Sequence, residues 1–424
     1  MTITVMNDYL VFPVYTHATE KRVDFLYKGK TVYRLNLKLD HASPDFYAYI
    51  DVSRFKGKDL ELSVEPEMEF SCWEADELDI GNVYREANRP QIHFSVKNGF
   101  LGKPSALIYK DGIYHMFYHY HPGALEDGDF HLGHATSKDL IHWQEEKIAA
   151  FPDGKGFTDV HAVKEILECD EESEFFALAD SDGNKKWISM DETGNYLIGS
   201  IKNGKFQSEQ AEQALYYGNT AHAGKNFCGL QDGRTVRMDQ TAWHAPRSRF
   251  YGQMGIPTEL SLKKEGEFYY LQALPVDEIE ALYKNTNRYE NIKAQKGKTI
   301  EIPIADAAQM IHIKGGFAED AVLDMILFGR KVRIDFSENQ IQIGKSKAPA
   351  SVAKKTLDLV ILVDRCGMEL FADGGKICFS STEEAAMMDR NLLNLKICCN
   401  AEYSMHLLEI HSLESIWQNS PKKF

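Results

Sequence analysis

Side chains that can transfer protons or hold polar groups are concentrated between residues 103 and 247. Imidazoles titrate near neutral pH and also ligate metals, so the histidines of this stretch could be acid/base groups or metal ligands. Neighbouring carboxylates could exchange protons with a substrate. Lys103 and Arg247 could hold an acidic group, although an arginine there could equally be a solvated loop residue. The other candidates are His119, His121, His161, His222 and His244, with Asp129 and Asp159 as carboxylates.

Sequence motifs do not point to a metal or a bound cofactor. The chain contains no G-x-S-x-G, P-loop, dinucleotide-binding, HExxH or EF-hand pattern. Its seven cysteines show no C-x-x-C or Cys/His ligand spacing. We therefore predict a remodelled polar pocket rather than a metal site, with no metal and no cofactor.

Composition limits the partners. A formal charge of −15 over 424 residues argues against nucleic acid or an anionic membrane, because both attract basic surfaces. The sequence has no apolar run of about 18 residues, so no membrane span is predicted. Residues 1–8 lack the features of a signal peptide. Scattered cysteines favour free thiols in a reducing compartment over disulfides. We expect a cytoplasmic protein.

Short alternating strands separated by turn residues predict an all-β chain, too long for one domain. Residues 1–85 predict an N-terminal β-sandwich-like domain, structural or carbohydrate-binding. Residues 86–275 contain aromatic strands joined by tight turns. A polar, helix-compatible stretch, 276–295, predicts a linker, and alternating strands return over 296–424.

Several motifs resemble those of the β-fructosidases, the glycoside hydrolase family of invertases, inulinases and levanases. The resemblance implies a five-bladed β-propeller followed by a C-terminal β-sandwich. Only about 190 residues separate Arg89 from Val276, and a blade takes roughly 40–50, so we predict a truncated propeller of three or four blades. The matching segments are 89–94 (R-P-x-x-H-F), 99–109, 114–120, 133–143, 252–262 (beginning G-x-M-x-x-P-x-E-L) and 357–376 (with D-R and E-L-F where the family has D-R and E-I-F).

The resemblance fails at the catalytic positions. The family's nucleophilic aspartate falls on Lys103, and its Glu-Cys-Pro acid/base motif is absent. Asp159 is a weak match for the family's sugar-holding aspartate. A retaining glycosidase needs two carboxylates about 5–5.5 Å apart, and an inverting one needs them about 6.5–9.5 Å apart.

Two functions remain open at this stage. The chain could act on or bind fructosides or related glycosides at a re-sited active site, with Asp159, His161 and Asp129 as catalytic candidates. It could instead be a non-catalytic pseudoenzyme that serves as a carbohydrate-binding or scaffolding protein. The predicted ligand is a sugar or oligosaccharide. Missing blades would leave open strand edges, so a homo-oligomer is also predicted. The substrate-binding candidates are Lys103, His119, His121, His222, His244 and Arg247.

Overall fold

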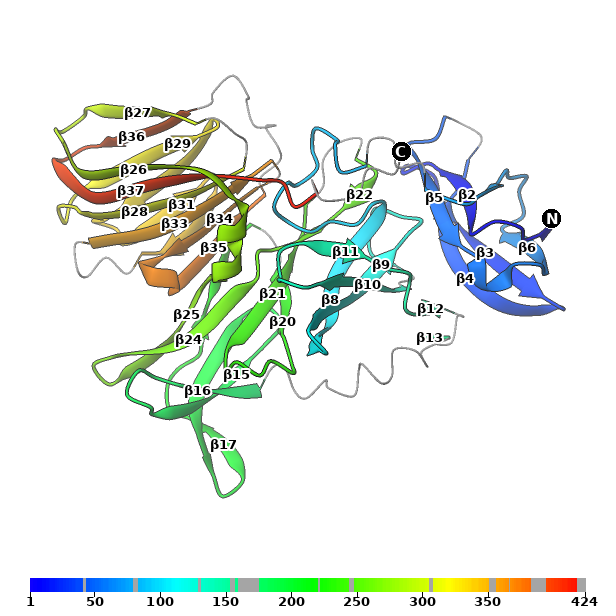
Figure 1. Cartoon of the computed structure of the whole chain (residues 1–424), viewed down its shortest axis with the longest axis horizontal. Coiled ribbons are helices and arrows are strands. Elements are labelled where there is room, and N and C mark those ends of the chain that lie inside the picture. The colour runs from blue at the N-terminus through cyan, green and yellow to red at the C-terminus, as the bar shows by residue number, and fades with distance from the viewer. Residues whose placement is uncertain are drawn as a thin grey trace.

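The chain is built almost entirely of β-strands, as the all-β prediction required. The computed structural model describes residues 1–40, 43–78, 83–128, 131–152, 157–158, 175–219, 222–243, 248–304, 308–350, 356–365, 367–382 and 394–417. Helix in these ranges is limited to three short 3-10 turns, η1 (Ser53–Phe55), η2 (Asp277–Leu282) and η3 (Asp373–Gly375). Figure 1 shows the N-terminal sheets at one end of the molecule and the C-terminal sheets at the other, with the remaining sheets between them. None of the described helices is long and apolar enough to cross a membrane.

Two small sheets form the N-terminal part. Alternating apolar residues along their strands face one another and close a single buried core, which includes Phe12, Phe25 and Tyr33. Apolar and aromatic residues form strands over 9–14 and 46–51, within the domain predicted for residues 1–85. One sheet has the order β1 (Thr2–Thr4), β6 (Asp59–Glu65), β3 (Glu20–Tyr27), β4 (Lys30–Lys38); the other has the order β5 (Phe46–Asp51), β2 (Tyr9–Val14), β7 (Trp73–Ala75).

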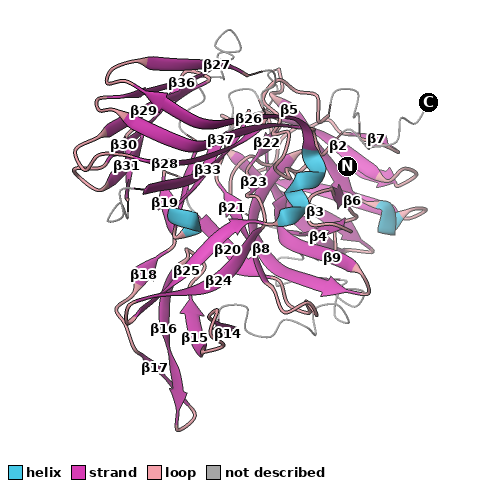
Figure 2. Cartoon of the chain, turned by 60° about the vertical axis from the view of Figure 1, so that its left-hand side comes forward, coloured by secondary structure: helices cyan, strands magenta, loops and turns pink. Residues whose placement is uncertain are grey.

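Three sheets occupy the middle of the described chain, and all their strands pair antiparallel except β22. The first runs β11 (Trp143–Glu145), β10 (His131–Ser137), β9 (Ile113–His121), β8 (Gly99–Lys110), and β22 (Phe250–Tyr251). The second runs β14 (Phe175–Ala179), β15 (Lys185–Met190), β16 (Asn195–Lys202), β17 (Lys205–Ser208), and β18 (Gln213–Ala214) pairs with β16. The third runs β20 (His222–Asn226), β21 (Thr235–Thr241), β24 (Thr258–Glu265), β25 (Phe268–Pro275), and β23 (Gln253–Met254) pairs with β21. A small ribbon, β12 (Phe151–Pro152) with β13 (Phe157–Thr158), lies beside them. Figure 2 shows the β16–β17 hairpin extending beyond the other sheets.

The three middle sheets share one apolar core. It combines side chains such as Met116 from the first sheet, Ile198 from the second and Leu271 from the third, all fully buried. The short strand β22 pairs in parallel with the start of β8, with Phe250 opposite Gly99, so a late segment of the chain completes the first sheet. This pairing brings together parts of the sequence that are about 150 residues apart.

The C-terminal part is a two-layer sandwich with its own core. The strand β26, over residues that we predicted as linker, is an edge strand with mostly exposed side chains. That prediction was wrong for 283–294, because an edge strand facing solvent on both sides lacks apolar alternation. Cys398 is half-buried and its neighbour Cys399 is buried, and both are free thiols. One sheet is β19 (Tyr216–Gly218), β35 (Ile377–Ser381), β34 (Gly367–Ala372), β33 (Thr356–Asp364), β28 (Gln309–Gly316), β37 (Tyr403–Leu413), β26 (Tyr283–Ala294); the other is β27 (Thr299–Pro303), β36 (Asn394–Cys399), β29 (Val322–Leu327), β30 (Arg330–Asp335), β31 (Gln340–Ile343), β32 (Ser346–Pro349).

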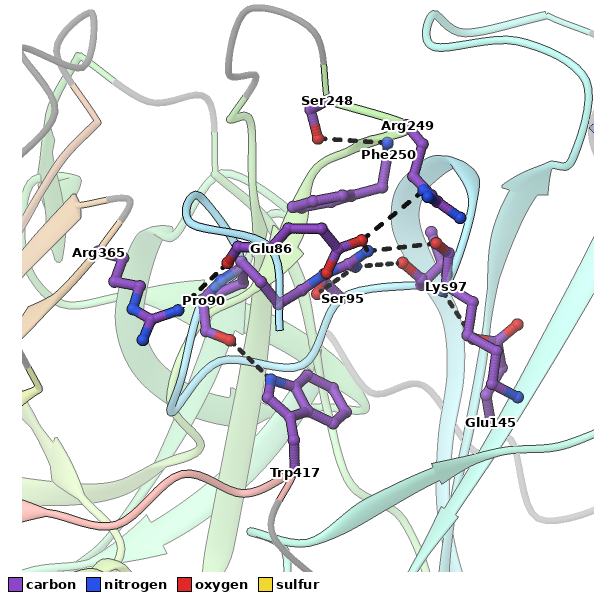
Figure 3. A network of polar contacts seen from close by, with 12 residues as sticks. Glu86, Pro90, Ser95, Lys97, Glu145, Ser248, Arg249, Phe250, Arg365 and Trp417 are labelled. Carbon is purple, nitrogen blue, oxygen red and sulfur yellow. Dashed lines mark hydrogen bonds and ion pairs between the residues drawn. The ribbon is translucent and has the colours of Figure 1, made fainter. Parts of the chain in front are cut away.

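Segment 86–93 connects the middle sheets to the sandwich through hydrogen bonds and ion pairs. The Trp417 indole donates to the Pro90 carbonyl oxygen at 2.6 Å, a contact visible in Figure 3. Ring nitrogens of the buried His93 lie 2.8 Å from Asp364 Oδ2 and 3.1 Å from Glu369 Oε2. Within the R-P-x-x-H-F segment, His93 therefore meets its partners on the sandwich, and the Pro90 carbonyl oxygen meets Trp417, which follows the last sandwich strand.

The N-terminal sheets are fastened to the first middle sheet through a buried polar contact. The Tyr33 hydroxyl bonds His131 Nε2, and both rings pack edge-on against Phe151. Asn98, just before β8, donates from Nδ2 to the Tyr47 carbonyl oxygen at 3.2 Å. The start of the bulge-bearing strand β8 is therefore held directly by the N-terminal part.

Candidate functional site

Strand β8 is irregular where Lys103 stands. Leu101 pairs with Tyr120 and Pro104 pairs with Tyr118, so Gly102 and Lys103 together oppose the single residue His119. Such a bulge redirects a side chain and is over-represented next to active sites. A side chain at position 102 could not be accommodated, because its Cβ would lie 2.8 Å from the Cβ of His119. The local sequence Gly102-Lys103-Pro104 thus suits a bulge, with proline at a point where the strand pairing is interrupted.

The Lys103 ammonium meets a carboxylate from another sheet. Its Nζ lies 2.6 Å from Glu192 Oε2, and the two side chains are 42% and 50% exposed, so both remain accessible to a solute. His119 lies half-buried beside Lys103, and burial together with the Lys103 charge lowers the pKa of its imidazole. A cation, a carboxylate and an uncharged imidazole therefore share one surface.

The turn that carries Glu192 is firmly held. Asp191 Oδ1 accepts bonds from the backbone amides of Thr193 and Asn195, both at 2.9 Å. The Glu192 carbonyl oxygen accepts from Arg237 Nη2 and from the Gly224 amide, again at 2.9 Å each. A carboxylate on so rigid a turn is positioned before any ligand arrives.

Strand β21 separates two kinds of polar residue because successive side chains point to opposite faces. Arg237 and Asp239 lie buried on one face and form an ion pair of 2.9 Å. Gln240 lies on the other face and donates from Nε2 to the Leu101 carbonyl oxygen at 3.3 Å, beside the bulge. Asp239 is therefore engaged with Arg237, whereas Gln240 supports β8.

Gly224 makes room for this ion pair. A Cβ at that position would fall well inside van der Waals contact of Asp239 Oδ1. We expect Gly224→Ala to destabilise the fold by about 1–3 kcal/mol through overpacking, measured as a lower urea midpoint. Gly128→Ala is the control, because its nearest neighbour would be at 3.4 Å, and it should leave the midpoint within error. Equal midpoints for both variants would contradict the expectation.

Only some of the predicted site residues lie together in the described structure. Lys103 and His119 are adjacent on the exposed surface described above. His121 is 1% exposed, its Nδ1 accepts from the Gly123 amide at 3.1 Å, and burial lowers its pKa to about 4. His222 belongs to β20. The other five candidates lie outside the described residues: Asp129, Asp159, His161, His244 and Arg247.

Sequence reasoning missed Glu192. It lies 89 residues from Lys103 in an Asp-Glu-Thr-Gly-Asn turn that matches no catalytic motif. The only available signal was the turn itself, whose Asp and Gly are typical of a tight hairpin. Within the described ranges, no three His, Cys, Asp or Glu side chains are grouped as metal ligands.

Comparison with known families gives two matches in chain order. Residues 93–163 match the model described as "Glycosyl hydrolases family 32 N-terminal domain", and residues 327–382 match "Glycosyl hydrolases family 32 C terminal". The first match covers the bulged sheet, and the second covers strands of the sandwich. Two segments of the chain thus match the family of the β-fructosidases, one in the middle sheets and one in the sandwich. The resemblance seen in the motifs is confirmed.

Individual relatives show how the chain differs from the family. It is 49% identical to the invertase of Schizosaccharomyces pombe over 70 residues, which is 16% of this chain and 12% of the invertase. The chain thus matches only a small part of that relative. It is 22% identical to the levanase of Bacillus subtilis over 507 positions, covering 84% of this chain and 74% of the levanase. Since 84% of 424 residues is about 356, about 150 aligned levanase positions have no counterpart here.

Solved structures support the fold of the family. The β-fructofuranosidase of Schwanniomyces occidentalis, crystallised with fructosyl-erythritol, aligns with a TM-score of 0.62 at 14% identity, over 80% of this chain and all of that one. Structures of this family combine a β-propeller with a β-sandwich. The described sheets agree with that combination.

Proposed function

We propose that this protein is a carbohydrate-active member of its family that acts on fructosides at an atypical site centred on Lys103 and Glu192. The observation that carries the proposal is the 2.6 Å contact between them at the β8 bulge. Position 103 is where the family's motif has its nucleophile, so the carboxylate missing from β8 is supplied from the neighbouring turn.

The chemistry follows from charge. Hydrolysis of a fructoside passes through an oxocarbenium-like transition state, which a lone ammonium would oppose. Glu192 neutralises Lys103 and can itself accept a proton from water or stabilise the developing positive charge. Lys103 fixes the carboxylate and can donate to a sugar hydroxyl. As the second acid/base group we propose Asp159, His161 or Asp129, from the sequence alone.

We further propose that the three middle sheets are the three blades of a shortened propeller over residues 86–275, with an N-terminal domain over 1–85 and with β26 counted as part of the C-terminal sandwich. The levanase alignment supports this, because about 150 unmatched positions leave room for at least two blades of roughly 40–50 residues. The homo-oligomer predicted from open strand edges also stays a proposal, and a single monomeric species in sedimentation would argue against it.

The test begins with hydrolysis of sucrose, inulin and levan by the purified chain. Glu192→Gln is expected to lower kcat at least 100-fold, because it removes the carboxylate while keeping the shape. Glu209→Gln is the matched control: Glu209 pairs with Lys186 at 2.5 Å in the same sheet but away from the bulge, and its loss should leave kcat unchanged. Equal activity of Glu192→Gln and the wild type would refute the proposed role.

A second function is supported by the same ion pair. Lys103 occupies the nucleophile's position, and Glu192 is its partner carboxylate in the described structure, so a non-catalytic fructoside-binding protein would show the same contacts. Calorimetry separates the two: binding without turnover, weakened by Lys103→Ala, would establish the binding protein. Absence of both binding and turnover would exclude fructosides as ligands.

A further inference from the structure

An aromatic strip covers the outer face of the three-stranded N-terminal sheet. Tyr47 on β5 and Trp73 on β7 flank β2 diagonally, opposite Pro13 and Val11 respectively. Their rings meet edge to face with centroids 5.2 Å apart. On the same face, Tyr9 and Tyr49 form a second edge-to-face pair at 6.2 Å.

The exposure of this strip is unusual for the molecule. Tyr47 is 44% exposed and Trp73 is 45% exposed. In the part of the chain that the structure describes, no other contacting aromatic pair has both rings exposed to this extent. Single exposed apolar residues are ordinary, but large rings held together at the surface indicate a binding site. The rings are fixed by each other and by strand pairing, so little side-chain entropy is lost when a ligand stacks on them.

The strip is connected to the candidate site through β8. The buried Asn98 donates to the Tyr47 carbonyl oxygen at 3.2 Å and to the Pro122 carbonyl oxygen at 3.3 Å. β8 begins at the next residue, and Phe100 stacks on Tyr251 at 5.1 Å, both half-exposed. From Asn98 to Lys103 an extended strand covers about 17 Å. That span suits a chain of several sugar units and exceeds a disaccharide.

We infer that Tyr47 and Trp73 form an accessory binding platform for a fructan chain whose end reaches the Lys103–Glu192 site. Sugar rings present faces of C–H groups that stack on aromatic rings, and the two rings carry no charge that would select an ionic ligand. The class of the ligand rests on the proposed function, and the platform itself rests on the geometry of the N-terminal sheet.

The test measures binding of soluble inulin and levan to the full-length chain by calorimetry. Trp73→Ala is expected to raise the apparent Kd for the polymer at least tenfold and to leave the Kd for sucrose unchanged. Tyr47→Ala should also raise the Kd for the polymer. Phe268→Ala is the matched control, because Phe268 is a 71% exposed aromatic on β25, and its loss should have no effect. Wild-type polymer affinity in Trp73→Ala would overturn the inference, as would failure of the wild type to bind either polymer.

Two further readouts separate this inference from its alternatives. If Trp73→Ala converts a dimer to a monomer in sedimentation while polymer binding is unchanged, the platform is a contact between two copies and the inference is wrong. If the wild type binds polymer in a Trp73-dependent way but hydrolyses none, the platform is confirmed and the proposed catalysis fails. Glu192→Gln should abolish turnover and keep polymer binding, which shows that the two sites are distinct.

Discussion

His93→Gln is expected to lower the free energy of unfolding by about 3–5 kcal/mol at pH 6, because it leaves two buried carboxylates without a cationic partner. His93 is almost fully buried, Asp364 is fully buried and Glu369 is mostly buried. Asp364 is also held by the backbone amides of Gln91 and Ile92, each at 2.9 Å. The imidazolium is therefore a buried cation that joins the middle sheets to the sandwich.

The same triad makes stability depend on pH. Burial alone would lower the pKa of His93, but the charges and hydrogen bonds of Glu369 and Asp364 outweigh it and raise the pKa to about 10. An unfolded histidine titrates near pH 6.5. Since the folded pKa is the higher one, the stabilisation is complete below about pH 6.5 and is lost as the pH rises towards 10. For Asp364, burial would raise the pKa but His93 lowers it below the usual range, so its contribution is lost on acidification instead.

Thermal unfolding at pH 6, 8 and 9.5 measures this effect. The wild type should lose stability across the series, and His93→Gln should be less stable at pH 6 and nearly flat to pH 9.5. His142→Gln serves as control, because its partner Asp139 and His142 itself are both partly exposed, and its profile should follow that of the wild type. Parallel profiles for wild type and His93→Gln would show that the imidazole does not carry the dependence.

Arg89→Met should lower the free energy of unfolding by a similar amount, about 3–5 kcal/mol, because it removes the cation from a buried hydrogen-bond network. The Arg89 guanidinium has no exposed surface and stacks on Phe250 at 3.6 Å. It donates two bonds to the Glu86 carboxylate, at 2.8 and 3.1 Å, and others to Ser95, Val96 and Lys97. Figure 3 shows Glu86, Ser95 and Lys97 gathered around this point, with Arg249 and Arg365 also contacting Glu86. Methionine keeps much of the volume and leaves these acceptors unpaired.

Urea unfolding compares this variant with two others. Arg89→Lys should recover little, since an ammonium cannot reproduce the planar fork that holds Glu86 from two nitrogens. Arg288→Met removes an exposed arginine that pairs with Glu290 on the edge strand β26, and should change stability by less than about 0.5 kcal/mol. A loss for Arg89→Met no larger than for Arg288→Met would contradict the buried network.

The framework could be predicted from the sequence, and the site only in part. Tyr-rich alternation and the Asp111-Gly112 turn specify the β8–β9 hairpin locally, so its position followed directly from the residues. The bulge could not be read in the same way, because Gly102-Lys103 opposing one residue is a property of the pairing between two strands. Glu192 was missed because its relation to Lys103 arises from packing between sheets. The strand β26 was missed because a solvated edge strand has no apolar pattern.

The contact between Trp417 and Pro90 has a consequence for the order in which the chain can fold. It joins residues separated by 327 positions, and the partners of His93 lie more than 270 residues after it. During synthesis on the ribosome, residues 1–78 can pair among themselves early, whereas His93 and the Pro90 carbonyl oxygen must wait for nearly the whole chain. Contacts of such long range slow folding. The first middle sheet therefore emerges before the partners of His93 and Pro90 exist, and its attachment to the sandwich is completed only after residue 417 has been made.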